Sequence, residues 1–257
     1  MKRIIFLTTV AGLLALEGEA GPLTVLTLAG DGIGPLPARL HLAGPDGKPV
    51  RSANALPFWR DHVSSPGRAE FALSAGTHQL TVERGPEWES ETQAVEIPES
   101  GATTEVRIRL NRIANLAGEG WWAGETHIHR AGHEVEALMR AEDLHFGQLI
   151  SWWNAANPWK NTPLPSPAVT QFEGNRFVHQ LGGEDERDGG ALLFFNLDKP
   201  IDITAGKRHH PSSLGYARQA KAAGAWIDIE KPFWWDVPMW IAHGIGDSIG
   251  IAQNHMH

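Results

Sequence analysis

The stretch EVRIRL, Glu105–Leu110, alternates apolar and charged residues and decides how the first half of the chain is interpreted. Its valine, isoleucine and leucine fall on one face of an extended strand, and its two arginines fall on the other. Comparable short runs lie upstream, between turn residues: LTVLTL (Leu23–Leu28), ARLHL (Ala38–Leu42), THQLTVER (Thr77–Arg84) and TQAVEI (Thr92–Ile97). Several short strands without a helix-period stretch between them predict a small all-β sandwich over residues 21–112.

This first segment carries no motif that points to chemistry. His41, His62 and His78 are scattered through it, and we interpret each as a surface or strand residue rather than a ligand. The pieces GKPV (47–50), LSAG (73–76) and GPEW (85–88) resemble the carboxypeptidase-regulatory-like (transthyretin-like) sandwich. The resemblance implies a spacer or a binding module.

The N-terminus has the pattern of a secretory signal peptide. Lys2 and Arg3 precede the apolar run Ile4–Leu16, and the small residues Gly18 and Ala20 follow. The run is shorter than the roughly 20 residues that span a bilayer, so we expect cleavage near Ala20 and no membrane span. The alternative is a buried N-terminal strand. We therefore expect residues 1–20 to be removed and the rest to be secreted or periplasmic.

The overall composition excludes several classes of protein. The formal net charge is −8, which provides none of the basic excess that a nucleic-acid partner requires. The chain has no cysteine, so disulfides, thiolate metal sites and cysteine nucleophiles are excluded. A hydrophobic fraction of 42% and a charged fraction of 20% are typical of a folded globular protein.

Residues 113–257 alternate between stretches with strand patterns and stretches with helix patterns. Strands are expected at Glu125–His129, Gly147–Trp152, Phe177–Gly182, Ala191–Asn196, Ala225–Glu230 and Asp247–Ala252, and helices at Glu134–Asp143, Pro211–Ala223 and Trp235–His243. Such alternation predicts an α/β domain with a largely parallel sheet or barrel. A site in such a domain gathers at the carboxyl ends of the strands.

The sharpest candidate site is the strand GETHIH, Gly124–His129. Alternate side chains of a strand share a face, so Glu125, His127 and His129 project together. Two imidazoles and a carboxylate suit a divalent ion such as Zn, Mn or Fe. The alternative is a polar strand face that packs against solvent or a partner.

The surrounding stretch WWAGETHIHR, residues 121–130, resembles the first motif of the PHP superfamily of metallohydrolases. The order of sandwich, HxH strand and later glutamate resembles the CehA/McbA (carbaryl-hydrolase-like) type. The resemblance implies a distorted β/α barrel that hydrolyses ester, carbamate or phosphoester bonds with divalent metal. It also implies metal ligation by His127, His129 and Glu184.

The chain departs from that family's pattern at several points. Ser151–Asn154 replaces a Thr-Asp-His-Asn motif, Ala191 replaces a histidine, and Lys231-Pro232 replaces a His-Pro pair. A final Asp-x-His motif has no counterpart, and about six strands are fewer than barrel closure needs. We therefore expect a C-terminally incomplete member, in which His255 is either an internal residue near the site or an arbitrary terminus.

Other residues can replace the missing ligands. Asp228 and Glu230 share one face of the Ala225–Glu230 strand, where they either bind metal or form structural ion pairs. His133 is an additional ligand if its loop folds back, or otherwise a surface residue at a helix start.

The expected activity assigns roles to the remaining candidates. Metal lowers the pKa of bound water, and Glu125 or Glu230 takes the proton. Trp122, Trp153, Lys231 and Trp234 contact a small-molecule or carbohydrate-like substrate. One alternative is a non-catalytic extracytoplasmic protein that binds a carbohydrate or another ligand at a tryptophan-rich mouth. A further alternative is that the sandwich is the functional part and serves as an adhesion or cell-surface module.

Overall fold

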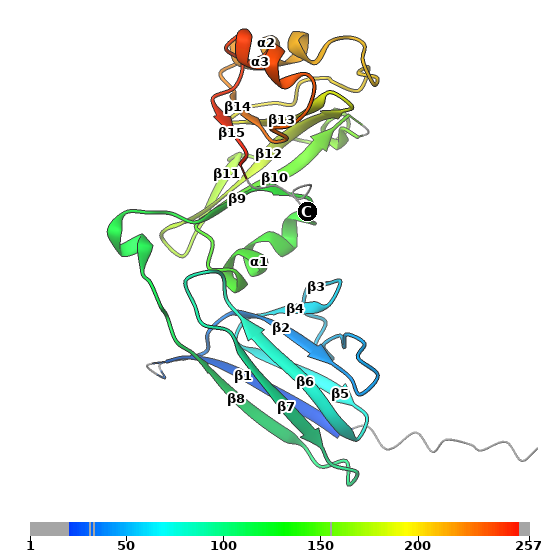
Figure 1. Cartoon of the computed structure of the whole chain (residues 1–257), viewed down its shortest axis with the longest axis vertical. Helices are drawn as coiled ribbons and strands as arrows, with labels where there is room; N and C mark the ends of the chain where they lie inside the picture. The colour runs from blue at the N-terminus through cyan, green and yellow to red at the C-terminus, as the bar shows by residue number, and fades with distance from the viewer. Residues whose placement is uncertain (1–20, 31, 33, 155, 252–257) are drawn as a thin grey trace, which may run out of the picture.

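The computed structural model describes residues 21–30, 32, 34–154 and 156–251. They form a β-sandwich followed by a seven-stranded sheet with three short α-helices, and Figure 1 shows the two parts stacked along the long axis. The expected signal peptide, the end of the expected Asp247–Ala252 strand and His255 lie outside the described residues.

The sandwich consists of two sheets that share one apolar core. The smaller sheet has the order β5-β1-β8, and the larger has the order β3-β4-β2-β6-β7. Alternation along the strands sends every second side chain inward, as in β5, where Ala69, Phe71 and Leu73 are buried. The bounds are β1 Gly21–Ala29, β2 Ala38–Ala43, β3 Phe58–Trp59, β4 His62–Ser65, β5 Arg68–Leu73, β6 Gly76–Glu83, β7 Glu91–Ile97 and β8 Thr104–Leu110.

The second sheet is open and mixed. Its order is β15-β14-β13-β12-β10-β9, and β11 also pairs with β12. Strands β9, β10 and β12 are parallel, whereas β12, β13 and β14 are successively antiparallel. The bounds are β9 Gly124–Ile128, β10 Phe146–Trp153, β11 Val169–Phe172, β12 Arg176–Arg187, β13 Gly190–Phe195, β14 Trp226–Ile229 and β15 Ser248–Ile249.

The expected α/β fold with an incomplete β/α barrel is wrong. The described residues hold only three short α-helices: α1 Val135–Ala141, α2 Ser213–Ala222 and α3 Val237–Ala242. The chain turns directly from β12 into β13 through Asp188 and Gly189, so these strands must be antiparallel. A parallel barrel needs a crossover between successive strands, and this hairpin leaves no chain for one.

The helices cover opposite faces of the second sheet. Ile227 and Ile229 pack in one cluster with residues of α2 and α3, including Ala217 and Trp240. The other face carries a smaller cluster that includes Met139 of α1. Figure 1 shows α1 between this sheet and the sandwich, with α2 and α3 on the far side. The face toward α1 is therefore the one that meets the sandwich.

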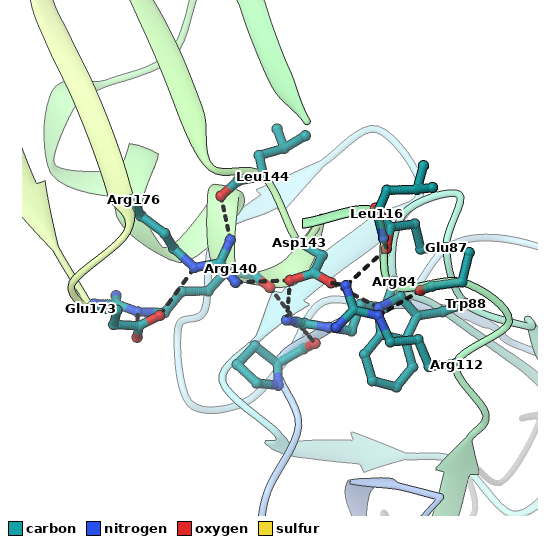
Figure 2. Close-up of polar contacts among 12 residues, drawn as sticks. Arg84, Glu87, Trp88, Arg112, Leu116, Arg140, Asp143, Leu144, Glu173 and Arg176 are labelled. Atoms are coloured by element: carbon teal, nitrogen blue, oxygen red, sulfur yellow. Dashed lines mark hydrogen bonds and ion pairs between the residues drawn. The ribbon is translucent and has the colours of Figure 1, made fainter. Parts of the chain in front are cut away.

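Asp143 is the polar centre of the contact between the two parts (Figure 2). Its Oδ1 accepts hydrogen bonds from Arg84 Nη2 and Arg176 Nη2, both at 2.8 Å, and its Oδ2 accepts one from Trp88 Nε1 at 2.9 Å. Arg112 Nη2 lies 3.4 Å from Oδ2. Arg84, Trp88 and Arg112 follow sandwich strands, whereas Arg176 begins β12. We call these five residues the Asp143 cluster.

The charge at the centre of this cluster is stabilised by its partners. Burial alone would raise the pKa of Asp143, but Arg84 and Arg176 hold that pKa below its usual 3.8. The backbone of Asp143 has a φ of 58°, in the left-handed region that aspartate tolerates better than most residues. The cluster therefore fixes the sandwich against the second sheet.

None of the helices among the described residues is long and apolar enough to cross a membrane.

Candidate metal site

The three residues that the sequence singled out as metal ligands lie together. His127 is on β9, His129 follows the end of that strand, and Glu184 is on β12. Strand β10 lies between β9 and β12 and pairs with both in parallel, with Trp153 opposite Glu184. The sheet thus brings together side chains that are 55 residues apart in sequence.

The donor atoms form a compact triangle. His129 Nε2 lies 3.0 Å from both His127 Nε2 and Glu184 Oε2, and the third side, from His127 Nε2 to Glu184 Oε2, is 3.2 Å. Ligands at about 2.0–2.2 Å around a tetrahedral ion lie roughly 3.3–3.6 Å apart. An outward movement of a few tenths of an ångström would therefore admit an ion.

Two buried carboxylate oxygens next to the triangle support the interpretation that the triangle binds a metal ion. Glu184 Oε1 and Glu230 Oε2 are buried and have no hydrogen-bond partner among the described residues. An unsatisfied buried carboxylate oxygen is costly, and a cation satisfies it better than a neutral donor does. The donor set and its surroundings therefore fit a divalent ion.

Glu230 lies behind His127 rather than beside the other donor atoms. Its Oε1 is 3.4 Å from His127 Nδ1, whereas the triangle uses Nε2. A carboxylate that accepts the Nδ1 proton leaves Nε2 available to a metal and fixes the orientation of the ring. The geometry thus favours Glu230 as a residue that orients His127 over Glu230 as a direct ligand.

The other candidates from β14 and β9 have different partners. Asp228 accepts a hydrogen bond from Ser248 Oγ at 2.5 Å, and burial raises the pKa of Asp228. Ile227 and Ile229 point to the opposite, apolar face of the sheet. Glu125 is exposed, and its Oε1 accepts a hydrogen bond from the backbone N–H of His127 at 2.8 Å. The group of three donors therefore includes neither Asp228 nor Glu125.

Lys231 is a buried counter-charge for the carboxylates. Its Nζ contacts Glu186 and lies 3.6 Å from Glu230 Oε2 and 4.0 Å from Glu184 Oε1. The side chain is only 4% exposed, so the structure places it among acidic groups rather than at a surface where a substrate would meet it.

The neighbouring side chains shift the pKa values of His127 and Glu184 in opposite directions. Burial alone would lower the pKa of His127, but hydrogen bonds to Glu184 and Glu230 raise it to about 10. Burial would likewise raise the pKa of Glu184, but His127 and His129 lower it to about 2. A proton on His127 therefore partly balances the carboxylates, and a divalent ion would take over that role.

The predicted tryptophan-rich mouth does not form as a single surface. Trp153 lies edge-on to His129, with ring centroids 5.6 Å apart, so it borders the metal site. Trp122 lies edge-on to His145 instead. Trp234 lines a separate cavity of about 720 Å³, together with residues that include Phe233 and Trp235.

A cleft between the sandwich and the second sheet adjoins the metal site. It has a volume of about 540 Å³ and is lined by His127 and His129, by Met139 of α1, and by Arg39 and Trp59 of the sandwich. The sequence did not point to Arg39 or Trp59 because neither belongs to a motif. They line the cleft only because the sandwich packs against the second sheet.

Three comparisons tested the similarity of the chain to known proteins. No protein-family model and no curated protein matches it. A minor pilin of Streptococcus agalactiae, GBS52, is 23% identical over 38% of this chain and 46% of its own, with a TM-score of 0.31. The Bacillus anthracis TIE protein is 14% identical over 37% and 17%, with a TM-score of 0.28. The major pilin BcpA of Bacillus cereus is 16% identical over 37% and 30%, with a TM-score of 0.29.

These findings correct the family expected from the sequence. No family model supports membership of the PHP superfamily or of the carboxypeptidase-regulatory-like family. The open mixed sheet also lacks the barrel that the PHP resemblance implied. The resemblance is therefore wrong, and the hydrolase activity inferred from it is wrong as well.

Proposed function

We propose that this chain is an extracytoplasmic binding protein that holds a divalent cation at His127, His129 and Glu184 and takes a small ligand in the adjoining cleft. The observation that carries the proposal is the triangle of donor atoms, beside two buried carboxylate oxygens that accept no hydrogen bond and have only the more distant Lys231 Nζ as a counter-charge. The signal-peptide pattern of residues 1–20 supports a location outside the cytoplasm.

The donor set favours zinc and leaves room for a ligand atom. Two imidazoles and one carboxylate suit zinc, with manganese and iron as weaker candidates. Three protein ligands leave at least one position of a tetrahedral ion open. An oxygen atom of the bound molecule would complete the coordination at that position.

The walls of the cleft indicate the rest of the ligand. Arg39 is already paired with Glu83 and Glu142, and Arg130 is paired with Glu134, so neither offers a free charge to an anion. The remaining wall is mainly apolar and includes Ile128, Leu138, Met139 and Leu144. We infer a small, mostly apolar molecule that carries one oxygen donor for the metal.

Removing one ligand tests the metal site. We expect His129→Ala to weaken zinc binding at this site by more than the roughly 10–100-fold that loss of an outer hydrogen-bond partner costs. His129 has a side chain that is 43% exposed, so its removal should leave the fold intact. Isothermal titration calorimetry with zinc measures the change, and circular dichroism checks the fold.

The matched control is His133→Ala, which removes an exposed histidine outside the triangle. It should bind zinc as the wild type does. Glu184→Gln should reproduce the loss seen in His129→Ala, because it removes the charge and keeps the shape. Unchanged zinc affinity in both ligand variants would refute the proposed site.

A second candidate function is carbohydrate binding at the cavity lined by Phe233, Trp234 and Trp235. The observation that favours it is that Phe233 and Trp235 are 72% and 77% exposed, although large aromatic side chains are rarely so exposed without a partner. The same cavity is lined by Glu186, Arg187 and Asp188. Aromatic faces stack on the C–H faces of a sugar, and charged groups bond to its hydroxyls.

Removing the more exposed ring tests this candidate. We expect soluble oligosaccharides to change the intrinsic fluorescence of the wild type, and Trp235→Ala to abolish that response. Trp121→Ala is the matched control, because Trp121 is similarly exposed at 70% but does not line the cavity. A wild type that responds to none of a broad panel of glycans would exclude carbohydrate binding here.

A further inference from the structure

A second group of side chains of the types that bind metals lies on the sandwich, in residues that the sequence left without a role. Strands β2 and β4 are antiparallel, with Leu40 opposite Val63. Continuing that register by one residue places His41 of β2 opposite His62 of β4. Their ring centroids are 5.1 Å apart. Directly opposed residues share a face of the sheet, so the two imidazoles can act together.

The turn before β4 adds a carboxylate to this pair. Trp59 and His62 pair across the β3–β4 hairpin, which leaves Arg60 and Asp61 as its turn. Arg60 has a φ of 51°, which is typical of a tight two-residue turn. Asp61 Oδ1 lies 3.0 Å from His62 Nδ1, and Asp61 Oδ2 lies 3.4 Å from His41 Nδ1.

The other nitrogen of His41 has an acidic neighbour as well. Glu83 Oε2 lies 3.4 Å from His41 Nε2, and this nitrogen is buried without a hydrogen bond among the described residues. Glu83 is thus a carboxylate that can accept an Nε2 proton. A proton on Nε2 leaves Nδ1, the nitrogen that faces Asp61, available to a metal.

Space for an ion and its waters lies beside the group. A cavity of about 230 Å³ is lined by His41 and Asp61 together with Gln79 and Thr81 of β6. One donor atom from each of His41, Asp61 and His62 lies within 4.8 Å of the others. A modest closure would bring these atoms to metal-binding distances.

We propose that His41, Asp61 and His62 bind a second divalent ion, zinc first among them. Two imidazoles and a carboxylate without a thiolate are the donor set that suits zinc, and water completes the coordination from the cavity. This site is separate from the one at His127, His129 and Glu184, and it does not depend on that proposal.

The ion would fix the hairpin that borders the cleft. Trp59 lines the cleft, and the guanidinium of Arg130 lies 4.8 Å from its ring centroid. Arg130 Nη2 also donates to the backbone oxygen of Phe58, at 3.5 Å. Arg130 directly follows His129 in the chain, so an ion on the sandwich holds the wall next to the first metal site.

Counting bound ions tests the second site in the full chain. We expect the wild type to bind two equivalents of zinc in isothermal titration calorimetry, and His129→Ala to keep one. Adding Asp61→Asn to His129→Ala should remove the remaining equivalent. Asp61 is 62% exposed, so the substitution should not unfold the protein.

The matched control is Asp202→Asn in the same His129→Ala background, because Asp202 is also 62% exposed and lies far along the chain from the hairpin. It should keep the remaining equivalent. Retention of that equivalent in His129→Ala/Asp61→Asn would overturn the second site. The wild type could also bind only one equivalent of zinc. If Asp61→Asn loses that equivalent and His129→Ala keeps it, the second site is supported and the first site is refuted.

Hydrogen exchange gives a readout that does not depend on stoichiometry. We expect zinc to slow amide exchange in residues 58–63 of the His129→Ala variant, because the ion joins the hairpin to β2. The slowing should be absent after Asp61→Asn and present after Asp202→Asn. If zinc does not change amide exchange in residues 58–63 of the His129→Ala variant, the proposal is wrong.

Discussion

Asp143→Asn should lower the free energy of unfolding by about 3–5 kcal/mol, because it leaves the buried Arg84 without its carboxylate partner and leaves Arg176 with Glu173 alone. The side chains of Arg84 and Arg176 are 7% and 10% exposed, and each donates to Asp143 Oδ1 at 2.8 Å. Asparagine keeps the shape of aspartate and tolerates the same left-handed backbone, so the change removes the charge and one of the two acceptor oxygens without changing the backbone. The measurement is urea denaturation followed by tryptophan fluorescence and circular dichroism.

The control for this substitution is an exposed ion pair. Glu105 and Arg107 are 2.8 Å apart, with side chains that are 46% and 65% exposed. Glu105→Gln should change stability by no more than about 0.5 kcal/mol, as surface substitutions usually do. If Asp143→Asn lowers the free energy of unfolding by as little as Glu105→Gln does, the Asp143 cluster is not the main polar contact between the sandwich and the second sheet.

The pH dependence gives an independent check of the same cluster. The folded pKa of Asp143 lies below the usual 3.8, so its charge stabilises the fold fully above the unfolded pKa. That contribution is lost as the pH falls through the folded value. The stability difference between wild type and Asp143→Asn should therefore be constant from neutral pH down to about pH 5 and narrow in more acidic solution. A difference that widens on acidification would contradict this assignment.

Gly183→Ala should cost about 3 kcal/mol or more, because the added methyl group has no space. A Cβ at this position would overlap the six-membered ring of Trp152, which is fully buried. Trp152 is stacked on Phe194, with ring centroids 5.8 Å apart, and its Nε1 donates to Leu181 O at 3.0 Å. The ring therefore cannot move aside without breaking other contacts. The same chemical denaturation measures the effect.

A double substitution separates this clash from other effects of the methyl group. Trp152→Phe removes part of the ring that the new Cβ would meet, so Gly183→Ala should cost less in that background than alone. Gly215→Ala in α2 is the matched control, because a Cβ there meets nothing within 4 Å. That change should stabilise the protein by about 0.5–1 kcal/mol. Equal costs of Gly183→Ala in both backgrounds would rule out the clash with Trp152.

Gly183 also affects the metal site through its neighbour. Glu184 follows it on β12, and Trp153, next to Trp152 on β10, lies opposite Glu184 in the sheet. A bulkier residue at position 183 would push these two strands apart where the triangle of donor atoms forms. The close approach of β10 and β12 is thus a condition for bringing Glu184 to His129.

The local patterns of the sequence predicted short-range features well. Alternation in Glu105–Leu110 indicated a strand with Val106, Ile108 and Leu110 on one face; in β8 Ile108 and Leu110 are buried and Val106 is partly buried. Helical spacing predicted a helix near α1, and proline and glycine end signals predicted one near α2; these two helices and the expected one near α3 are each shorter than expected. These features depend on contacts between neighbouring residues, which a single sequence contains.

The sequence predicted the arrangement of the strands poorly. Alternating strands and helices suggested parallel pairing, but pairing depends on which strands meet after the chain turns. The hairpin at Asp188 and Gly189 reverses the direction, and the sheet stays open. A short motif such as HxH fixes two side chains on one strand face and nothing beyond it, so a likeness in that motif was compatible with a quite different fold.

The sequence by itself determined that His127 and His129 project from one strand face, because side chains alternate along every strand. Only the tertiary structure decided that Glu184 meets them and that Glu230 lies behind His127, because those contacts depend on the register of β9, β10 and β12. The same is true of His41 and His62, which are unremarkable in the sequence. They become neighbours only because β2 and β4 pair in antiparallel, and cross-strand pairing joins residues that no local pattern connects.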